Sequence, residues 1–347
     1  MQSEEASREV EKRNAAMQIM GTFQEAKDIF HWIAPELERL EKTLCEALAS
    51  PAPMISEIGT HLVRSGGKRL RPALYLLAAK SCEGFDEKKA MPLAAAVELI
   101  HMASLVHDDV IDRAQTRRGA ATANAKWGNQ AAVLTGDYIF AQAFSMVSRK
   151  GYTEDVGELL AALVQGLCAG EILQDSALYT AAHDLKEYEQ RIAMKTADFL
   201  SVCCELGGMV GGASPETCAG LKAYGKAVGM AFQITDDLLD VTGDEERIGK
   251  PAGNDIRQGV VTLPVICALE KSPDRDELRG IVTNREMTDE MVAHAIEIVR
   301  ASDGVAAARA RADEYLEEAR RILPEVVGGE AREAFLRAAT YIGQRDF

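Results

Sequence analysis

Apolar and polar residues follow a helical order along most of the chain. Apolar positions recur every three or four residues, which places them on one face of an α-helix. The first clear run lies between Ile19 and Leu48 and ends before Pro51. The same pattern predicts helices over residues 54–63, 73–82, 89–113, 130–148, 154–176, 185–210 and 215–241, and short amphipathic helices after Lys271. No segment shows the period-two alternation that is typical of a half-buried strand.

The composition also favours helices. Of the 347 residues, 47% are hydrophobic but only 5% are aromatic, so the apolar content is mainly aliphatic. No long Pro- or Ser-rich linker divides the chain. We therefore expect an all-α fold, with a polar N-terminal segment over residues 1–17 and a single domain over residues 18–347, built from roughly ten or more helices.

Charge and cysteine content narrow the range of partners. The net charge of -15 argues against nucleic acid as a ligand and against broad attachment to anionic lipid. No stretch approaches the roughly 18 uncharged apolar residues of a membrane span, and the charged start has no apolar signal-peptide core. Seven cysteines without metal-ligand spacing fit a reduced chain. A cytoplasmic protein without a membrane span is the expectation.

Two acidic clusters carry the strongest chemical signal. The segments Met102–Asp112 and Met230–Asp240 share five of eleven residues, and each places three aspartates at positions i, i+1 and i+4: Asp108, Asp109 and Asp112, and Asp236, Asp237 and Asp240. A solvated helix face is the ordinary explanation of one such cluster. Here both follow apolar stretches near predicted helix C-termini, where negative charges are destabilised. Carboxylates without a nearby Cys/His set favour Mg²⁺, which takes a few carboxylates and substrate phosphate oxygens.

Basic residues stand out in so acidic a chain. Gly66 and Gly67 precede Lys68, Arg69 and Arg71, a pattern that suits anion binding but equally a turn with solvated basic side chains. Arg117 and Arg118 follow the first acidic cluster, where they could clamp phosphate or pair with the aspartates. His101 lies two helical turns before Asp108, and a lone helical histidine is more often structural than a ligand.

The motifs together resemble the trans-isoprenyl diphosphate synthases, the polyprenyl synthetase family, including long-chain members such as octaprenyl diphosphate synthase. The resemblance covers roughly Leu37 to Leu269. One difference is Val260, after Gly259, where family members often carry lysine. The matching residues are, in chain order, Gly66-Gly67-Lys68-Arg69-Leu70-Arg71-Pro72, His101, Asp108-Asp109-x-x-Asp112, Arg117-Arg118-Gly119, Lys195-Thr196, Phe232-Gln233-x-x-Asp236-Asp237-x-x-Asp240 and Gly249-Lys250-Pro251.

The resemblance implies a helical bundle around a central cavity, a homodimer, and head-to-tail condensation of isopentenyl diphosphate with an allylic diphosphate. It implies that both acidic clusters hold Mg²⁺, with three ions per active site, to stabilise departing pyrophosphate. By the same resemblance, Lys68, Arg71, His101 and Arg118 hold isopentenyl diphosphate, and Arg117, Lys195 and Lys250 hold the allylic diphosphate. Thr196 and Gln233 would offer oxygen dipoles near the allylic cation.

Product length is expected to depend on residues one turn before the first cluster. Ser104 and its neighbour Ala103 are small, whereas short-chain relatives carry bulky aromatics near these positions; Phe232 takes the place of Ser104 in the second cluster. This favours a long all-trans product made from farnesyl diphosphate. Three alternatives remain open: a short-chain geranylgeranyl or farnesyl diphosphate synthase, a subunit of a heteromeric synthase, and a class I terpene cyclase. The cyclase has no use for Lys68, Arg71 and Arg118.

Overall fold

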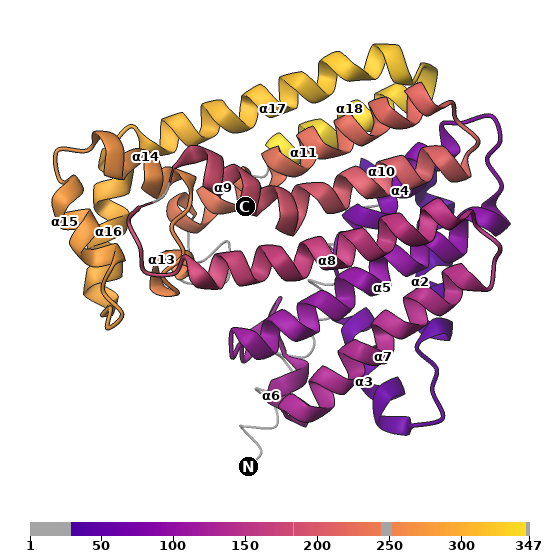
Figure 1. Ribbon diagram of the computed structural model, residues 1–347, viewed down its shortest axis with the longest axis horizontal. Coiled ribbons are helices and arrows are strands. Elements are labelled where there is room, and N and C mark those ends of the chain that lie inside the picture. Colours follow the sequence, from indigo (N-terminus) through magenta and orange to yellow (C-terminus); the bar gives the residue numbers. More distant parts are fainter. Residues whose placement is uncertain (1–28, 183, 244–251, 345–347) are drawn as a thin grey trace, which may run out of the picture. The chain divides into compact units, whose positions relative to one another are not determined.

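The computed structural model of the protein describes residues 29–182, 184–243 and 252–344. Within these ranges the chain is almost entirely helical (Figure 1), which confirms the all-α prediction. The described residues form two compact units. The first contains the residues up to Leu160 with Cys203–Cys218 and Gly329–Ala334, and the second contains Ala161–Val202, Ala219–Gly328 and the residues from Phe335. The prediction of one domain over residues 18–347 stays a prediction.

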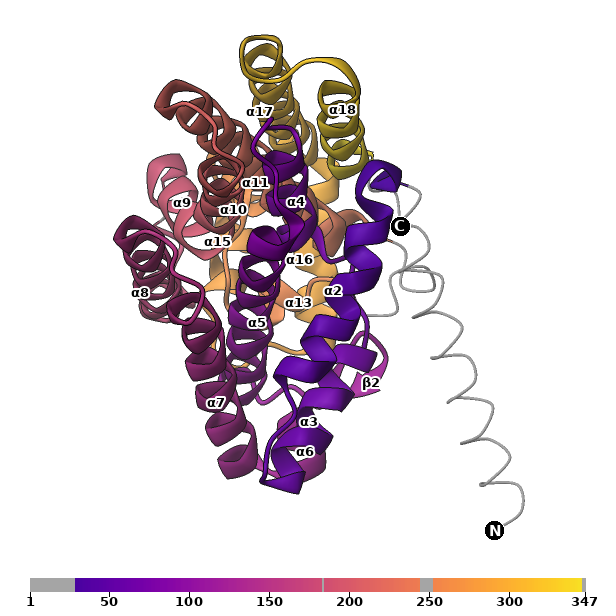
Figure 2. The ribbon, with the colours of Figure 1, turned by 90° about the vertical axis from the view of Figure 1, so that its right-hand side faces the viewer.

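The first unit is built around one long helix, α5 (Glu87–Ile111). Asp86 caps it by accepting a hydrogen bond from the backbone N–H of Lys88 at 2.9 Å. Helices α2, α4 and α7 pack against α5, and Figure 2 shows α2 and α7 beside it. The other elements of this unit are η1 (His31–Ile33), α2 (Ala34–Ala47), α3 (Pro53–Arg64), α4 (Leu70–Lys80), β1 (Thr116–Arg117), β2 (Ala120–Ala121), α6 (Ala123–Trp127), α7 (Asn129–Ser148) and the start of α8 (Glu154–Ser176).

A continuous helical run that includes a π-helical turn begins in the second unit. It passes from α9 (Leu185–Ile192) through η2 (Ala193–Ala197) into α10 (Asp198–Val210), whose residues from Cys203 onward belong to the first unit. The remaining elements, some of which extend into the first unit, are α11 (Pro215–Thr242), α13 (Asn254–Arg257), α14 (Leu263–Lys271), α15 (Arg275–Val282), α16 (Asp289–Ala301), α17 (Gly304–Val326) and α18 (Gly329–Gly343).

Two glycines let α11 lie directly on the backbone of this run. A Cβ at Gly225 would lie 2.5 Å from Leu200 O, and one at Gly229 would lie 2.5 Å from the Cα of Ala197. Side chains four residues apart share a helix face, so Gln233 continues the face that carries Gly225 and Gly229. The close approach therefore brings Gln233 to Thr196.

The sequence analysis missed two small elements. Residues 116–121 form an antiparallel hairpin that pairs Thr116 with Ala121 and Arg117 with Ala120, and α6 follows it. The strands are two residues long, too short to show an alternating pattern. The absence of period-two alternation therefore gave no sign of this short hairpin, whereas helices occur in every range for which they were expected and the structure is described.

Two helices have the length and apolar composition of a membrane span. In α5, 72% of the apolar window is buried, as in the core helix of a soluble protein. In α8 only 22% of the window is buried. Ile172 and Leu173 on α8 are 68% and 47% exposed, so this helix presents an apolar surface.

Candidate active site

The first acidic cluster lies at the C-terminal end of α5, as its sequence context predicts. Asp108 and Asp109 belong to the last turn, and Asp112 is the C-cap. Asp109 is buried and forms an ion pair with Arg117, whose Nε lies 2.7 Å from Oδ1. Asp108 is half-buried and Asp112 is exposed. Of the two roles considered for Arg117, pairing with an aspartate is the one observed.

The hairpin after the cluster controls the direction of the two arginines. Arg118 and Gly119 form its turn with φ values of 53° and 74°, the positive pair required by a type I′ turn. His61 Nε2 lies 2.8 Å from the carbonyl oxygen of Ala121 and ties the second strand to α3. Neighbouring residues at a strand end point to opposite sides. Arg117 therefore pairs with Asp109, whereas Arg118 at the turn contacts the carbonyl oxygen of Gly66.

The Gly-Gly segment reaches Arg118 from the other side. Arg118 Nη1 donates a hydrogen bond to the carbonyl oxygen of Gly66. A Cβ at Gly67 would lie 2.5 Å from the same Nη1 atom. Glycine at position 67 is therefore what lets the Arg118 guanidinium lie against this segment, and the two basic motifs form one cluster.

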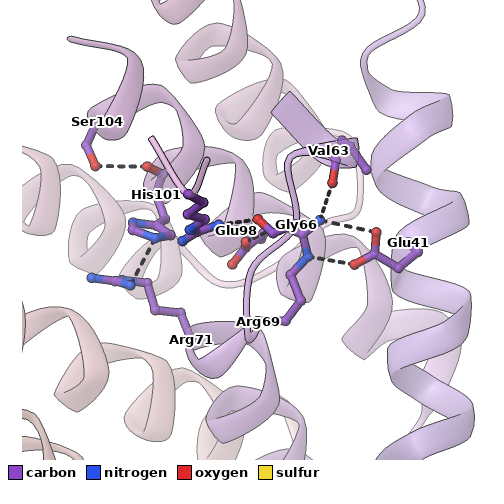
Figure 3. A network of polar contacts seen from close by, with 9 residues as sticks. Glu41, Val63, Gly66, Arg69, Arg71, Glu98, His101 and Ser104 are labelled. Atoms are coloured by element: carbon purple, nitrogen blue, oxygen red, sulfur yellow. Dashed lines mark hydrogen bonds and ion pairs between the residues drawn. The ribbon is translucent and has the colours of Figure 1, made fainter. Parts of the chain in front are cut away.

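His101 and Arg71 complete the basic cluster (Figure 3). Arg71 Nη1 lies 3.1 Å from His101 Nε2. Burial and then the charges of Arg71, Arg118 and Arg117 hold the pKa of His101 well below its usual value. Burial, and after it the charges of the nearby arginines, lower the pKa of Arg118 to about 10, although Glu98 acts in the opposite direction. Arg118 is exposed as a whole residue, and its guanidinium contacts Gly66 and Gly67. So crowded a set of cations favours a bound anion.

A pocket opens beside this cluster. Its polar wall includes Arg69, Glu98, His101, Asp109, Arg117 and Arg118. The pocket also has an apolar lining, formed by Leu62, Met102 and Leu105. A small ligand with an anionic head and a hydrocarbon body matches both walls.

The second acidic cluster is held by hydrogen bonds within the second unit. Tyr188 Oη donates to Asp237 Oδ2 at 2.6 Å, and Gln233 Nε2 donates to Asp237 Oδ1 at 2.9 Å. Thr196 Oγ1 donates to Gln233 Oε1 at 2.7 Å, so Thr196, Gln233 and Asp237 form a chain. Asp237 is 3% exposed. The predicted neighbours Thr196 and Gln233 are therefore brought together at an acidic group.

A fourth carboxylate adjoins this cluster. Asp240 accepts hydrogen bonds from the backbone N–H groups of Asn254 and Asp255, each at 3.1 Å. Burial and then repulsion from Asp240, Asp237 and Asp236 raise the pKa of Asp255 well above its usual value. Burial likewise raises the pKa of Asp237, against the hydrogen bonds from Tyr188 and Gln233. These carboxylates destabilise one another in the absence of a cation.

Lys195 occupies the π-helical turn η2. Its Nζ forms an ion pair of 2.7 Å with Glu171 on α8, and the lysine side chain is 34% exposed. A π-helical turn often marks a functional position, because it redirects side chains within a helix. Lys250, the other lysine predicted to bind the allylic substrate, lies outside the described residues.

The predicted product-length residues lie on α5. Ala103 is fully buried, and Ser104 is half-buried and donates from Oγ to the carbonyl oxygen of His101 at 2.9 Å. Phe232, in the equivalent place on α11, is half-buried. Ser104 lies one turn before Asp108 on the same helix, as expected from their spacing.

Four polar residues at these clusters were not predicted from the sequence as site residues: Arg69, Glu98, Tyr188 and Asp255. The sequence marked Arg69 only as part of the basic run. Glu98 lies one turn before His101, and Tyr188 lies seven residues before Lys195. Glu98 and Tyr188 could have been suspected because each lies at helical spacing from a residue predicted to bind substrate. Their hydrogen-bond partners, however, are distant in sequence.

The donor set suits magnesium. In the described ranges no group of three or more His, Cys, Asp or Glu side chains is gathered closely enough to hold a metal ion alone. Mg²⁺ is usually bound through one or two carboxylates together with water and substrate phosphate. The mutual repulsion of the carboxylates around Asp240 and Asp255 would be relieved by such an ion. Each acidic cluster by itself would hold such an ion together with a diphosphate: Asp108, Asp109 and Asp112 in the first unit, and Asp236, Asp237 and Asp240 in the second.

Comparison with known proteins decides the family. The polyprenyl synthetase family model matches residues 52–299. The chain belongs to the polyprenyl synthetase family. It is 39% identical to heptaprenyl diphosphate synthase component 2 of Bacillus subtilis over 92% of this chain and 91% of that one. It is 33% identical to octaprenyl diphosphate synthase of Escherichia coli, over 90% and 97% of the two chains.

Solved structures agree with this assignment. A decaprenyl diphosphate synthase from Rhodobacter capsulatus superposes with a TM-score of 0.87 at 35% identity, covering 93% of this chain and 99% of that one. The resemblance to trans-isoprenyl diphosphate synthases, long-chain members included, is thus confirmed. This polyprenyl synthetase is a prenyltransferase enzyme.

Proposed function

We propose that this polyprenyl synthetase catalyses the Mg²⁺-dependent, head-to-tail condensation of isopentenyl diphosphate with an allylic diphosphate. The observation that carries the proposal is the pocket of the first unit. It combines Arg118, His101 and the Gly66-Gly67 segment with an apolar wall and adjoins the acidic end of α5. Isopentenyl diphosphate has the anionic head and short hydrocarbon body that such a pocket accommodates.

The basic residues would divide between the two substrates. Lys68, Arg71, His101 and Arg118 hold the diphosphate of isopentenyl diphosphate in this proposal, and Arg117, Lys195 and Lys250 hold the allylic one. Arg117 and Lys195 are ion-paired with Asp109 and Glu171. Each can keep part of this contact while it adds a phosphate, because both side chains present several N–H donors.

The chemistry is charge separation followed by carbon–carbon bond formation. Magnesium bound at the two acidic clusters, three ions per active site by resemblance, would supply the Lewis acid that neutralises the departing pyrophosphate. The double bond of isopentenyl diphosphate attacks the allylic cation, and loss of one proton, which the released pyrophosphate can accept, restores a double bond. Thr196 and Gln233 form a fixed pair through their 2.7 Å hydrogen bond, so their oxygen dipoles can face the cation without reorganisation.

The proposed product is a long all-trans polyprenyl diphosphate, octaprenyl or similar, grown from farnesyl diphosphate. Small residues at positions 103 and 104 support it. Relatives carry names from heptaprenyl to nonaprenyl diphosphate synthase, but one from Methanothermobacter thermautotrophicus, 37% identical, is a short-chain isoprenyl diphosphate synthase. A short-chain product is therefore the alternative that the experiment must separate.

We also propose a homodimer that uses the exposed apolar face of α8. The buried fraction of this helix is low, and Ile172 and Leu173 expose large apolar side chains. The name of the Bacillus subtilis relative, a synthase component 2, makes a heteromeric assembly the competing possibility. A cytoplasmic location, expected from the odd number of cysteines, stays a prediction.

One experiment tests the proposed function. The purified chain is incubated with farnesyl diphosphate, radiolabelled isopentenyl diphosphate and Mg²⁺, and the products are separated by reversed-phase chromatography after removal of phosphate. We expect long prenyl alcohols that disappear when EDTA replaces Mg²⁺. Geranylgeraniol alone would establish the short-chain alternative. Product formation without isopentenyl diphosphate would establish a cyclase, and activity only with a second chain would establish a heteromeric subunit.

A further inference from the structure

Arg69 differs from the other basic residues of its motif because it is buried. Its side chain is 3% exposed although it stands between Lys68 and Arg71, which belong to the proposed substrate site. It is the N-cap of α4 and has a φ of 48°, a left-handed conformation that is unfavourable for a large side chain. Something in the surrounding structure must hold it there.

The guanidinium of Arg69 is held by three separate helices (Figure 3). Nε and Nη2 donate to the two carboxylate oxygens of Glu41 on α2, at 2.6 and 3.2 Å. Nη1 donates to Glu98 Oε1 on α5 at 2.8 Å, and Nη2 donates to the carbonyl oxygen of Val63 on α3 at 3.0 Å. Burial alone would lower the pKa of Arg69, but Glu98 and Glu41 raise it above its usual value. With four N–H groups engaged, Arg69 has little capacity left for a phosphate.

Glu98 links this network to the anion pocket. It is 3% exposed, lies one helical turn before His101 on α5 and, like Arg69, lines the pocket. Its charge also acts on Arg118, whose pKa it raises against the effect of burial. Glu98 is therefore a buried negative charge that acts on both Arg69 and Arg118, and its hydrogen bond with Arg69 fixes its position.

We propose that Arg69 is a positioning residue for isopentenyl diphosphate: its clamp on Glu41, Glu98 and Val63 fixes the Gly66–Arg71 segment and so sets the positions of Lys68 and of Arg71, which contacts the pocket residue His101. The inference rests on the proposed function. A planar fork is required, because a lysine offers a point charge and cannot bridge two carboxylates and a carbonyl in one geometry. Misplacement of a binding group by about 1 Å can cost about a hundredfold in rate.

The test compares Arg69→Lys with Arg39→Lys. Arg39 also pairs with two carboxylates, Glu36 and Glu87, but its side chain is 46% exposed and it lies outside the pocket. For Arg69→Lys we expect the KM for isopentenyl diphosphate to rise by about ten- to a hundredfold, with the KM for farnesyl diphosphate changed by less than about twofold. Arg39→Lys should leave both values unchanged. Equal effects on the two substrates, or none on isopentenyl diphosphate, would refute the positioning role.

Glu98→Gln keeps the test decisive if Arg69→Lys does not fold. It keeps an oxygen acceptor for Arg69 Nη1 but removes the charge that holds the guanidinium, so a weaker clamp should raise the KM for isopentenyl diphosphate selectively here as well. A lower KM, the result of removing a negative charge from an anion pocket without loss of positioning, would refute the positioning role. Binding of inorganic pyrophosphate without Mg²⁺, measured by calorimetry, separates the two proposals. Wild-type protein that binds pyrophosphate but does not condense the substrates would contradict the proposed function alone. Pyrophosphate affinity unchanged in both Arg69→Lys and Glu98→Gln would contradict the inference alone.

Discussion

Arg71 and His101 share a hydrogen bond of 3.1 Å between Nη1 and Nε2. A guanidinium can only donate, so Nε2 of His101 accepts and the proton of the neutral ring lies on Nδ1. Burial and then the charges of four nearby arginines lower the pKa of His101 and so favour this neutral form. His101 thus presents an N–H at Nδ1 in a strongly cationic cluster without adding a further charge.

The neutral state of His101 predicts a pH-dependent stability. Its folded pKa is depressed, so below the unfolded value of about 6.5 the unfolded chain binds a proton that the folded chain does not. Stability should therefore fall as the pH falls below that value. Between pH 7.5 and 5.5 we expect a loss of up to about 1.4 kcal/mol from this residue, measured by urea unfolding. His101→Gln should lack this component, and an identical pH dependence of the two proteins would contradict the assignment.

Substitution of Gly67 should impair substrate binding more than folding. In Gly67→Ala the new Cβ would meet Arg118 Nη1 at 2.5 Å, and the end of a long side chain can move away. We expect the KM for isopentenyl diphosphate to rise by about tenfold or more and the free energy of unfolding to fall by less than about 2 kcal/mol. Gly157→Ala on α8 is the control, because a Cβ at this position would have no atom within 4 Å. It should leave the KM for isopentenyl diphosphate and the KM for farnesyl diphosphate unchanged. Unchanged kinetics in Gly67→Ala would show that Arg118 does not bind this substrate.

A bulky residue at position 104 should shorten the product. Ser104→Phe adds an aromatic ring one turn before Asp108, and the expected product from farnesyl diphosphate is geranylgeranyl diphosphate, the result of a single condensation. Leu105→Phe places the same ring at a position that lines the pocket of the first unit, so it should raise the KM for isopentenyl diphosphate without changing product length. Overpacking in either variant should cost about 1–3 kcal/mol of stability. Product chromatography decides, and long products from Ser104→Phe would disprove this account of length control.

Loss of the Tyr188 hydroxyl should weaken the second acidic cluster. Tyr188→Phe removes the 2.6 Å hydrogen bond to Asp237 Oδ2 and leaves a buried carboxylate with one fewer donor. We expect a loss of about 1–3 kcal/mol in unfolding free energy and a higher Mg²⁺ concentration for half-maximal activity. Tyr138→Phe on α7, a half-buried tyrosine of the first unit, should change neither quantity. A normal Mg²⁺ requirement in Tyr188→Phe would mean that Asp237 is not held by this bond.

A charge on α8 should weaken the proposed dimer. Ile172 is 68% exposed, and Ile172→Lys would bury an unpaired ammonium at a subunit interface. We expect the dissociation constant to rise by about tenfold or more in sedimentation analysis, against no change for Leu185→Lys on α9. A monomeric wild-type protein, or a dimer indifferent to Ile172→Lys, would place the interface elsewhere.

Much of the fold and half of the site are local properties of the sequence. Periodicity every three or four residues defined the helices, and the i, i+1, i+4 spacing placed Asp108 and Asp236 with their neighbours near helix ends. These predictions succeed because helix geometry relates residues that are close in sequence. The hairpin at residues 116–121 was missed because two-residue strands carry no period. The order of the motifs was sufficient for the family assignment.

The partners of those residues were decided by the tertiary structure. Arg69 meets Glu41 and Glu98 across 28 and 29 residues of sequence, and Tyr188 meets Asp237 across 49. Spacing along one helix cannot reveal such pairs, because packing between helices brings them together. The same holds for Arg117, because the sequence could not show which carboxylate it pairs with, and the hairpin directs its guanidinium to Asp109. Sequence alone determined which charged and polar groups the protein has and which of them lie on the same helix. The packing of helices against one another determined which of these groups form ion pairs and hydrogen bonds.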